Sequence, residues 1–125
     1  MIFDTDVFIW VQRGNRKAAA LIDDEAERFL SVQTLMELLQ SAKNKEQQRT
    51  VKRFLADFGF TVLPLTENIG HRALVYVEEY GISSGMRAGD AIVAATAIEN
   101  GMMLATGNFK HFRTVKDLDL KIFRP

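Results

Sequence analysis

The sequence predicts an α/β fold built on a mostly parallel sheet of five strands. Short apolar stretches typical of strands alternate with stretches that have the apolar spacing of helices. Strands that alternate with helices usually pair in parallel, and helices then cover both faces of the sheet. A chain of 125 residues has room for one hydrophobic core, so residues 1–125 are expected to form one domain.

The chain opens with a strand and a helix. Residues 2–4 are a short apolar stretch that ends in an aspartate, which indicates a buried strand. Thr5 can cap a first helix that continues to about Gln12. Gly14 and Asn15 then interrupt the helical pattern.

A second helix over residues 17–24 and a second strand over residues 29–32 follow. From Gln33 onward the pattern is helical again, because apolar residues recur on one stripe: Leu35, Leu38, Leu39 and Ala42. The next helix ends at Gly59 and has its own apolar face, made of Val51, Phe54, Leu55 and Phe58.

The second half repeats the alternation. Pro64 places the third strand, residues 61–65, at a strand end or a sheet edge. Thr66 can cap the helix that follows this strand. A second helix later in the chain is apolar on almost every side, and the segment between the two helices is the least regular of the chain. These elements are a helix over residues 67–80, the irregular segment 81–89, a buried helix over residues 90–100, and strands over residues 102–105 and 120–123.

Composition excludes several classes of site. Sixteen basic and sixteen acidic residues cancel, so a nucleic acid would have to be held by a local basic patch. The chain has no cysteine, which excludes disulfides and zinc–thiolate sites and fits a reducing, cytoplasmic compartment. No charged leader precedes an apolar stretch, and the longest apolar run, residues 91–98, is too short to span a membrane.

Polar residues follow the predicted strands. In open parallel sheets, ligands bind beyond the carboxyl ends of the strands, where the strand order reverses. The candidates are Asp4 and Asp6 after the first strand, residues 33–37 after the second, and residues 106–108 after the fourth.

The individual acids also have ordinary structural interpretations. Aspartates at helix starts commonly accept backbone N–H bonds, so capping is an alternative role for Asp4 and Asp90. Glu37 lies roughly opposite the apolar stripe of its helix, where glutamates are usually solvated. Together, however, three acids at three junctions would converge on one pocket, which divalent cations would stabilise. Ligand sets made only of oxygen favour Mg²⁺ or Mn²⁺.

Four segments resemble the motifs of PIN-domain nucleases, and in particular of the short VapC-type toxins of toxin–antitoxin pairs. Their order, their spacing and the total length all agree, so the resemblance covers essentially the whole chain. The third segment is the most specific of the set. The four segments are residues 4–9, 31–38, 90–97 and 104–112.

This resemblance implies a three-layer α/β/α sandwich and an endoribonuclease that depends on Mg²⁺ or Mn²⁺. It also implies a homodimer and inhibition by a small VapB-like antitoxin. Asp4, Glu37 and Asp90 correspond to the metal ligands of the family. Thr106 and Asn108 correspond to its polar fourth position, and Asp6 to a supporting residue beside the first acid.

Two departures from the family pattern concern the fourth motif. Asn108 stands where an aspartate is common in the wider superfamily, and His111 stands where an acidic residue is common. Both departures put a second metal site in doubt. His71, within its predicted helix, is expected to be structural or exposed.

Cationic residues lie near two of the motifs. The candidates for RNA binding are Arg13, Arg16 and Lys17 after the first helix and Lys110 and Arg113 after the fourth strand, where Lys116 follows. A solvated charged surface is the alternative interpretation. Residues 81–89 and the aromatic residues Phe3, Phe8 and Trp10 suggest surfaces for a second copy and for an antitoxin segment.

Two other functions match parts of this pattern. A haloacid-dehalogenase-type phosphatase would use Asp4 as its nucleophile, but Val7 replaces the usual glycine and Glu37 would have no role. A phosphate-accepting receiver module needs an aspartate at the end of its third strand, and residues 61–66 contain none.

Overall fold

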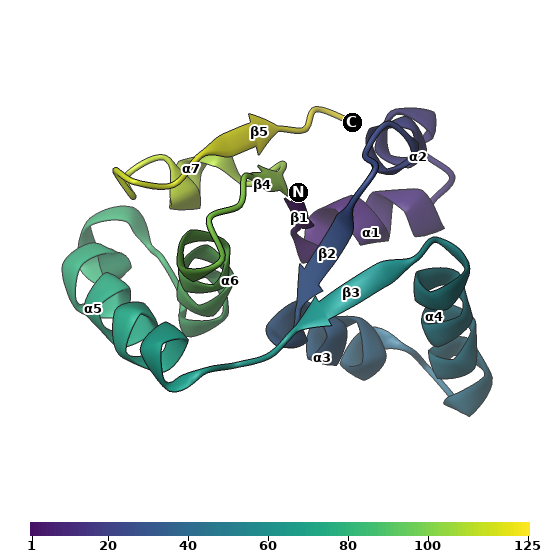
Figure 1. The fold of residues 1–125 in the computed structure, drawn as a ribbon, viewed down its shortest axis with the longest axis horizontal. Helices are drawn as coiled ribbons and strands as arrows, with labels where there is room; N and C mark the ends of the chain where they lie inside the picture. Colours follow the sequence, from purple (N-terminus) through teal and green to yellow (C-terminus); the bar gives the residue numbers. More distant parts are fainter.

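A five-stranded sheet, parallel throughout, forms the centre of the molecule (Figure 1). The computed structural model describes all residues from Met1 to Pro125. The strands lie in the order β3-β2-β1-β4-β5 and comprise β1 (Ile2–Phe3), β2 (Arg28–Ser31), β3 (Phe60–Leu63), β4 (Leu104–Thr106) and β5 (Leu120–Ile122). The predicted five-stranded sheet is therefore confirmed, and its parallel pairing extends to every strand.

Successive side chains of a strand point to opposite faces, and this alternation gives the molecule two cores. Ile2 and Leu104 belong to the core beneath α5 and α6, whereas Phe3 and Ala105 belong to the core beneath α1 to α4. Figure 1 shows α5 and α6 on one side of the sheet and α1, α2 and α4 on the other. The helices are α1 (Thr5–Gln12), α2 (Arg16–Asp23), α3 (Val32–Ser41), α4 (Lys45–Asp57), α5 (Glu67–Ser84), α6 (Ala88–Glu99) and α7 (Phe109–Phe112). The expected three-layer sandwich is confirmed.

The strand order reverses between β1 and β4. From β1 the chain builds outward to β2 and then to the edge strand β3, and afterwards it returns to place β4 and β5 on the other side of β1. The helices that follow β1 and β4 therefore pack on opposite faces of the sheet. In open parallel sheets, ligands bind at the carboxyl edge beside such a switch point.

Several boundaries differ from the sequence prediction. Asp4, and not Thr5, caps α1, because its Oδ1 accepts a hydrogen bond from the backbone N–H of Thr5. The segment 81–89 is mostly helical: α5 continues through a single glycine to Ser84 and ends at Gly85, whose φ of 72° is left-handed. Helix α6 begins at Ala88, so Asp90 is its third residue.

The suggested aromatic partner surface was wrong for Phe3 and Phe8. Phe3 is fully buried and Phe8 is 3% exposed. Both rings pack at an angle against Phe60, so they fill the core beneath α1 and α4. No helix combines the length and the apolar composition that a membrane crossing requires.

Candidate active site

Asp4 lies at the point where the strand order reverses. Its backbone N–H continues the sheet by donating to Ala105 O. Its Oδ1 accepts from the Thr5 backbone, and its Oδ2 accepts from the Thr106 hydroxyl at 2.8 Å. The residue is 8% exposed, so two loops from neighbouring strands hold a nearly buried carboxylate.

Asp6 joins α1 to the loop after β4. Its Oδ2 accepts the backbone N–H of Gly107 at 2.7 Å. A Cβ atom on Gly107 would lie only 2.7 Å from that oxygen and 3.3 Å from Phe123 O, so this close approach requires glycine. The other oxygen of Asp6, Oδ1, is buried and has no hydrogen-bond partner.

Helix α3 brings Glu37 toward the same region. Ser31 caps this helix by accepting from Thr34 N at 3.0 Å, and the Thr34 hydroxyl lies 3.4 Å from the hydroxyl of Thr5. Thr5 in turn donates to Glu37 Oε1 at 3.2 Å. Glu37 is only partly exposed and contacts Thr5, so it differs from the freely solvated glutamate that is the alternative interpretation.

Asp90 makes contacts at the start of α6 with two other elements. Its Oδ2 accepts from the backbone N–H of Arg87 at 3.3 Å, which closes the first turn of the helix. The same oxygen lies 3.0 Å from Nδ1 of His111, and that nitrogen lies 2.8 Å from Nδ2 of Asn108. Capping and a place in the acidic cluster are therefore combined in one carboxylate.

Burial makes Asp4 and Asp6 costly to ionise. The pKa of Asp4 is raised from 3.8 to about 7, mainly by burial and also by the charges of Asp6 and Asp90, while the hydrogen bonds from Thr106 and Thr5 oppose the rise. Burial likewise raises the pKa of Asp6 above its usual value. His111 Nδ1 lies 3.0 Å from Asp90 Oδ2, and no lysine or arginine forms a salt bridge with these acids.

The donor set fits a divalent cation better than it fits the protein alone. Carboxylate, hydroxyl and amide oxygens are the ligands that Mg²⁺ and Mn²⁺ prefer. The unpartnered Oδ1 of Asp6 and the raised pKa of Asp4 both indicate negative charge that lacks a counter-ion. No group of three or more histidine or acidic side chains is arranged so that it could hold one metal ion.

Comparison with known proteins identifies the family. The sequence model of the PIN domain matches residues 1–118. The chain belongs to the PIN domain family. The family that the four motifs resemble, the PIN-domain nucleases, is therefore confirmed.

Solved structures share this PIN fold over almost their whole length. A toxin-antitoxin complex from Klebsiella pneumoniae is 26% identical with a TM-score of 0.80, and the match covers 94% of this chain and 93% of that one. VapBC-1 from nontypeable Haemophilus influenzae is 21% identical with a TM-score of 0.77, and 98% of each chain is covered. VapBC2 from Rickettsia felis, bound to a DNA fragment from its promoter, is 20% identical with a TM-score of 0.77 over 99% and 100% of the two chains. No curated protein sequence matches the chain.

The predicted cationic residues fall into two groups in this PIN domain. Lys110 and Arg113 are exposed on and just after α7, which borders the acidic cluster through His111. Arg13 caps the far end of α1, where its guanidinium lies 5.2 Å from the centre of the Trp10 ring. The eight residues of α1 separate it from Asp4 by about 12 Å. Arg16 and Lys17 begin α2 at that same far end, so the structure does not bring these three cations to the acids.

Sequence reasoning missed His111, Thr5 and Thr34 as members of the site. His111 was noted only as a departure from the family motif, although both of its hydrogen-bonding neighbours, Asp90 and Asn108, had been singled out. The signal for these two threonines was their place inside the motifs: Thr5 directly follows Asp4, and Thr34 precedes Glu37 by about one helical turn.

The structure also bears on the phosphatase alternative. In a phosphatase of that type Asp4 would act as the nucleophile, whereas here its two oxygens accept hydrogen bonds from Thr5 and Thr106 and the residue is 8% exposed. The match to the PIN domain favours neither this alternative nor a receiver module.

Proposed function

We propose that residues 1–125 form one nuclease domain that hydrolyses RNA with the help of Mg²⁺ or Mn²⁺, as the VapC-type toxin of a toxin–antitoxin pair. The observation that carries this proposal is the group of acids around the buried Asp4 at the switch point of a PIN fold, without a lysine or arginine counter-ion. The PIN domain match supports the nuclease activity, and toxin–antitoxin complexes among the structural neighbours support the toxin role.

Asp4, Glu37 and Asp90 are the proposed metal ligands, and Asn108 offers a neutral oxygen beside them. A divalent cation at such a site lowers the pKa of a bound water and neutralises charge on the phosphate. Thr106 holds Asp4 in place through its hydroxyl, and Asp6 fixes the loop after β4 through Gly107. His71, by contrast, is exposed on α5 and has no part in the reaction.

The RNA backbone needs cations beside the acids, since the chain has no net charge. Lys110 and Arg113 on the α7 side of the cluster are the proposed phosphate contacts. Arg13, Arg16 and Lys17 could contact only nucleotides well away from the bond that is cleaved, because they lie at the far end of α1.

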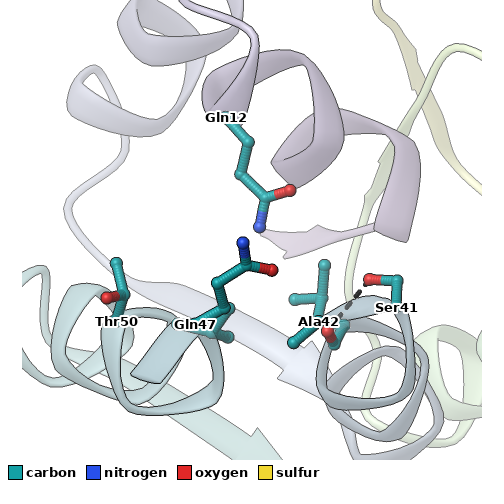
Figure 2. A pocket seen from close by; sticks show the side chains of 7 residues that line it. Gln12, Ser41, Ala42, Gln47 and Thr50 are labelled. Atoms are coloured by element: carbon teal, nitrogen blue, oxygen red, sulfur yellow. Dashed lines mark hydrogen bonds between the residues drawn. The ribbon is translucent and has the colours of Figure 1, made fainter. Parts of the chain in front are cut away.

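A groove between α1, α3 and α4 is the proposed binding site of the antitoxin. Its deeper part, about 240 Å³ in volume, is lined mainly by apolar side chains, of which Val11, Val51 and Phe54 are partly exposed. Gln12 and Gln47 point toward one another across its polar mouth (Figure 2). An amphipathic helix fits such a groove with its apolar face inward and its polar edges toward the two glutamines.

The homodimer that the family resemblance implies needs an apolar surface elsewhere. A shallow apolar hollow on α5 and α6 includes Leu65, Leu74, Val77 and Ile92. Leu65 is 51% exposed and Leu74 is 58% exposed, which is costly unless a second copy covers them. We place the dimer contact on this face.

The nuclease proposal is tested by cleavage of a mixed pool of single-stranded RNA. The wild type should cleave with Mg²⁺ or Mn²⁺ and stop when EDTA is added. Asp90→Asn should lose activity by about a hundredfold or more, since it removes a charged metal ligand. Asp119→Asn is the matched control, because Asp119 is exposed and precedes β5 at the opposite edge of the sheet. Activity that survives EDTA, or Asp90→Asn with wild-type rates, would overturn the proposal.

A further inference from the structure

His111 occupies a place in the fold that the proposed reaction does not yet use. It lies on α7, a single helical turn that the fully buried side chain of Phe112 fixes to the core. The ring is 28% exposed and faces Asp90 at the start of α6. On its other side, Nε2 lies beside Gly85 at the end of α5.

One nitrogen of this ring has two neighbours that require opposite roles. Nδ1 lies 2.8 Å from the Asn108 amide nitrogen, which can only donate. It also lies 3.0 Å from Asp90 Oδ2, which as a carboxylate can only accept. A neutral imidazole therefore satisfies one neighbour at a time: Nδ1–H serves Asp90, and a bare Nδ1 serves Asn108.

We propose that His111 is a positioning residue that decides how Asn108 faces the acidic cluster. Without metal, Nδ1–H donates to Asp90. When a divalent cation engages Asp90, the ring carries its proton on Nε2, and Nδ1 accepts from Asn108 Nδ2. The amide of Asn108 is then held by its nitrogen, so its carbonyl oxygen is left free for the cation.

Two contacts in the structure make this exchange feasible. Asp90 Oδ2 has a second donor, the Arg87 backbone N–H, so it does not depend on His111 alone. Asn108 is tied through its own backbone N–H to the Thr106 hydroxyl at 3.0 Å, and that hydroxyl donates to Asp4. The Asn108 side chain that His111 orients therefore belongs to the same loop that holds Asp4. The inference rests on the proposed metal-dependent function, because the cation is what changes the partner of Asp90.

The test is nuclear magnetic resonance of protein labelled with ¹⁵N in histidine, recorded in EDTA and then with Mg²⁺, without RNA. His111 should carry its proton on Nδ1 in EDTA and on Nε2 with Mg²⁺. His71, whose side chain is 74% exposed, is the internal control and should not change. In Asn108→Asp the donor is absent, so His111 should keep its proton on Nδ1 in both conditions.

A second measurement separates positioning from a structural role. Calorimetric titration with Mn²⁺ should show about tenfold weaker binding for His111→Ala, the size expected when a residue behind a ligand is lost. His111→Gln should recover much of the affinity, because its side-chain carbonyl can accept from Asn108.

The same tautomer in both conditions, or a charged ring in both, overturns the inference if Mg²⁺ still shifts the backbone amides of Asp4 and Asp90. That result would leave the proposed metal site intact. If Mg²⁺ shifts none of these amides, the metal dependence in the proposed function fails, and the role of His111 fails with it.

Discussion

Asp4 illustrates how a single side chain can serve both the fold and the site. It begins α1 by capping the first backbone N–H, and it joins β1 to β4 through Thr106. These bonds hold a carboxylate in a buried position where its charge is opposed by burial and by Asp6 and Asp90. The metal-free protein is therefore less stable than it would be with a neutral residue at this position.

This cost predicts a pH dependence of stability. The pKa of Asp4 is about 7 in the folded protein and 3.8 when unperturbed, so the folded state holds a proton that the unfolded state releases between these values. Stability without metal should therefore fall as the pH rises from about 4 to about 7, and the loss should persist above that.

Asp4→Asn removes this titration, so its advantage over the wild type should grow with pH. At about 1.4 kcal/mol for each pKa unit, the gain between pH 4 and pH 8 should be on the order of 3 kcal/mol. Urea unfolding in EDTA measures it, with Asp119→Asn as the control. An equal difference between variant and wild type at both pH values would contradict the assignment.

Gly107 is the residue whose replacement should disturb Asp6 most directly. In Gly107→Ala the new Cβ atom would stand 2.7 Å from Asp6 Oδ2 and 3.3 Å from Phe123 O, so the carboxylate must move. We expect a stability loss of about 1–3 kcal/mol and slower cleavage. Gly70→Ala is the matched control, because a Cβ atom there meets nothing within 4 Å and should stabilise α5 by up to about 1 kcal/mol. Thermal unfolding and cleavage rates of both variants distinguish the two cases, and an unaffected Gly107→Ala would show that the contact is not needed.

At the scale of helices and strands, much of the fold could be predicted because local patterns and topology agree. Alternating strands and helices implied parallel pairing, and parallel pairing implied that residues after β1 and β4 would meet. The contact between Asp4 and Thr106, which are 102 positions apart, follows from this topology.

The rest depends on tertiary packing that no local pattern records. Helix α5 continues past Gly81 because later residues still form hydrogen bonds with the preceding turn, as the Ser84 hydroxyl does by donating to Tyr80 O. Helix α7 has only four residues, and its stability comes from the buried Phe112. The pattern of its own helix alone favours a solvated Glu37, because it does not record that α3 also faces Thr5 of α1.

The cap of α3 connects this helix to the site. Ser31 accepts a hydrogen bond from Thr34 N. The Thr5 hydroxyl contacts the Thr34 hydroxyl and also donates to Glu37, so the cap is linked to this acid. Ser31→Ala should cost about 1 kcal/mol of stability and also slow cleavage, because Thr34 and Thr5 lose their anchor. Asn44→Ala removes a comparable cap, on α4, where Asn44 Oδ1 accepts from Gln47 N at 2.8 Å. Asn44→Ala should lose similar stability but keep the wild-type cleavage rate. If Ser31→Ala and Asn44→Ala cleave at the same rate, the cap of α3 does not support the site.

For the whole molecule, the two faces of the sheet have different proposed partners. The groove for the antitoxin lies among α1, α3 and α4, and the apolar hollow lies across the sheet on α5 and α6. Since the acids lie at the carboxyl edge between these two faces, both partners can bind without covering the acids.

The dimer contact predicts a change of assembly state when the hollow becomes charged. Leu74→Asp places a carboxylate on a side chain that is 58% exposed, so folding should be little affected while association is opposed. Light scattering at high concentration should give a dimer for the wild type and a monomer for the variant. A monomeric wild type would show that no second copy binds this face.

The claim on which the account depends is that Asp4 and Asp90 hold a divalent cation at the switch point of the sheet. Anomalous X-ray scattering from crystals soaked in Mn²⁺ locates such ions directly. We predict a Mn²⁺ peak within about 2.3 Å of carboxylate oxygens of both residues, and no peak there in crystals of Asp90→Asn. Mn²⁺ bound elsewhere in the molecule, with no peak beside Asp4 and Asp90, would contradict the claim.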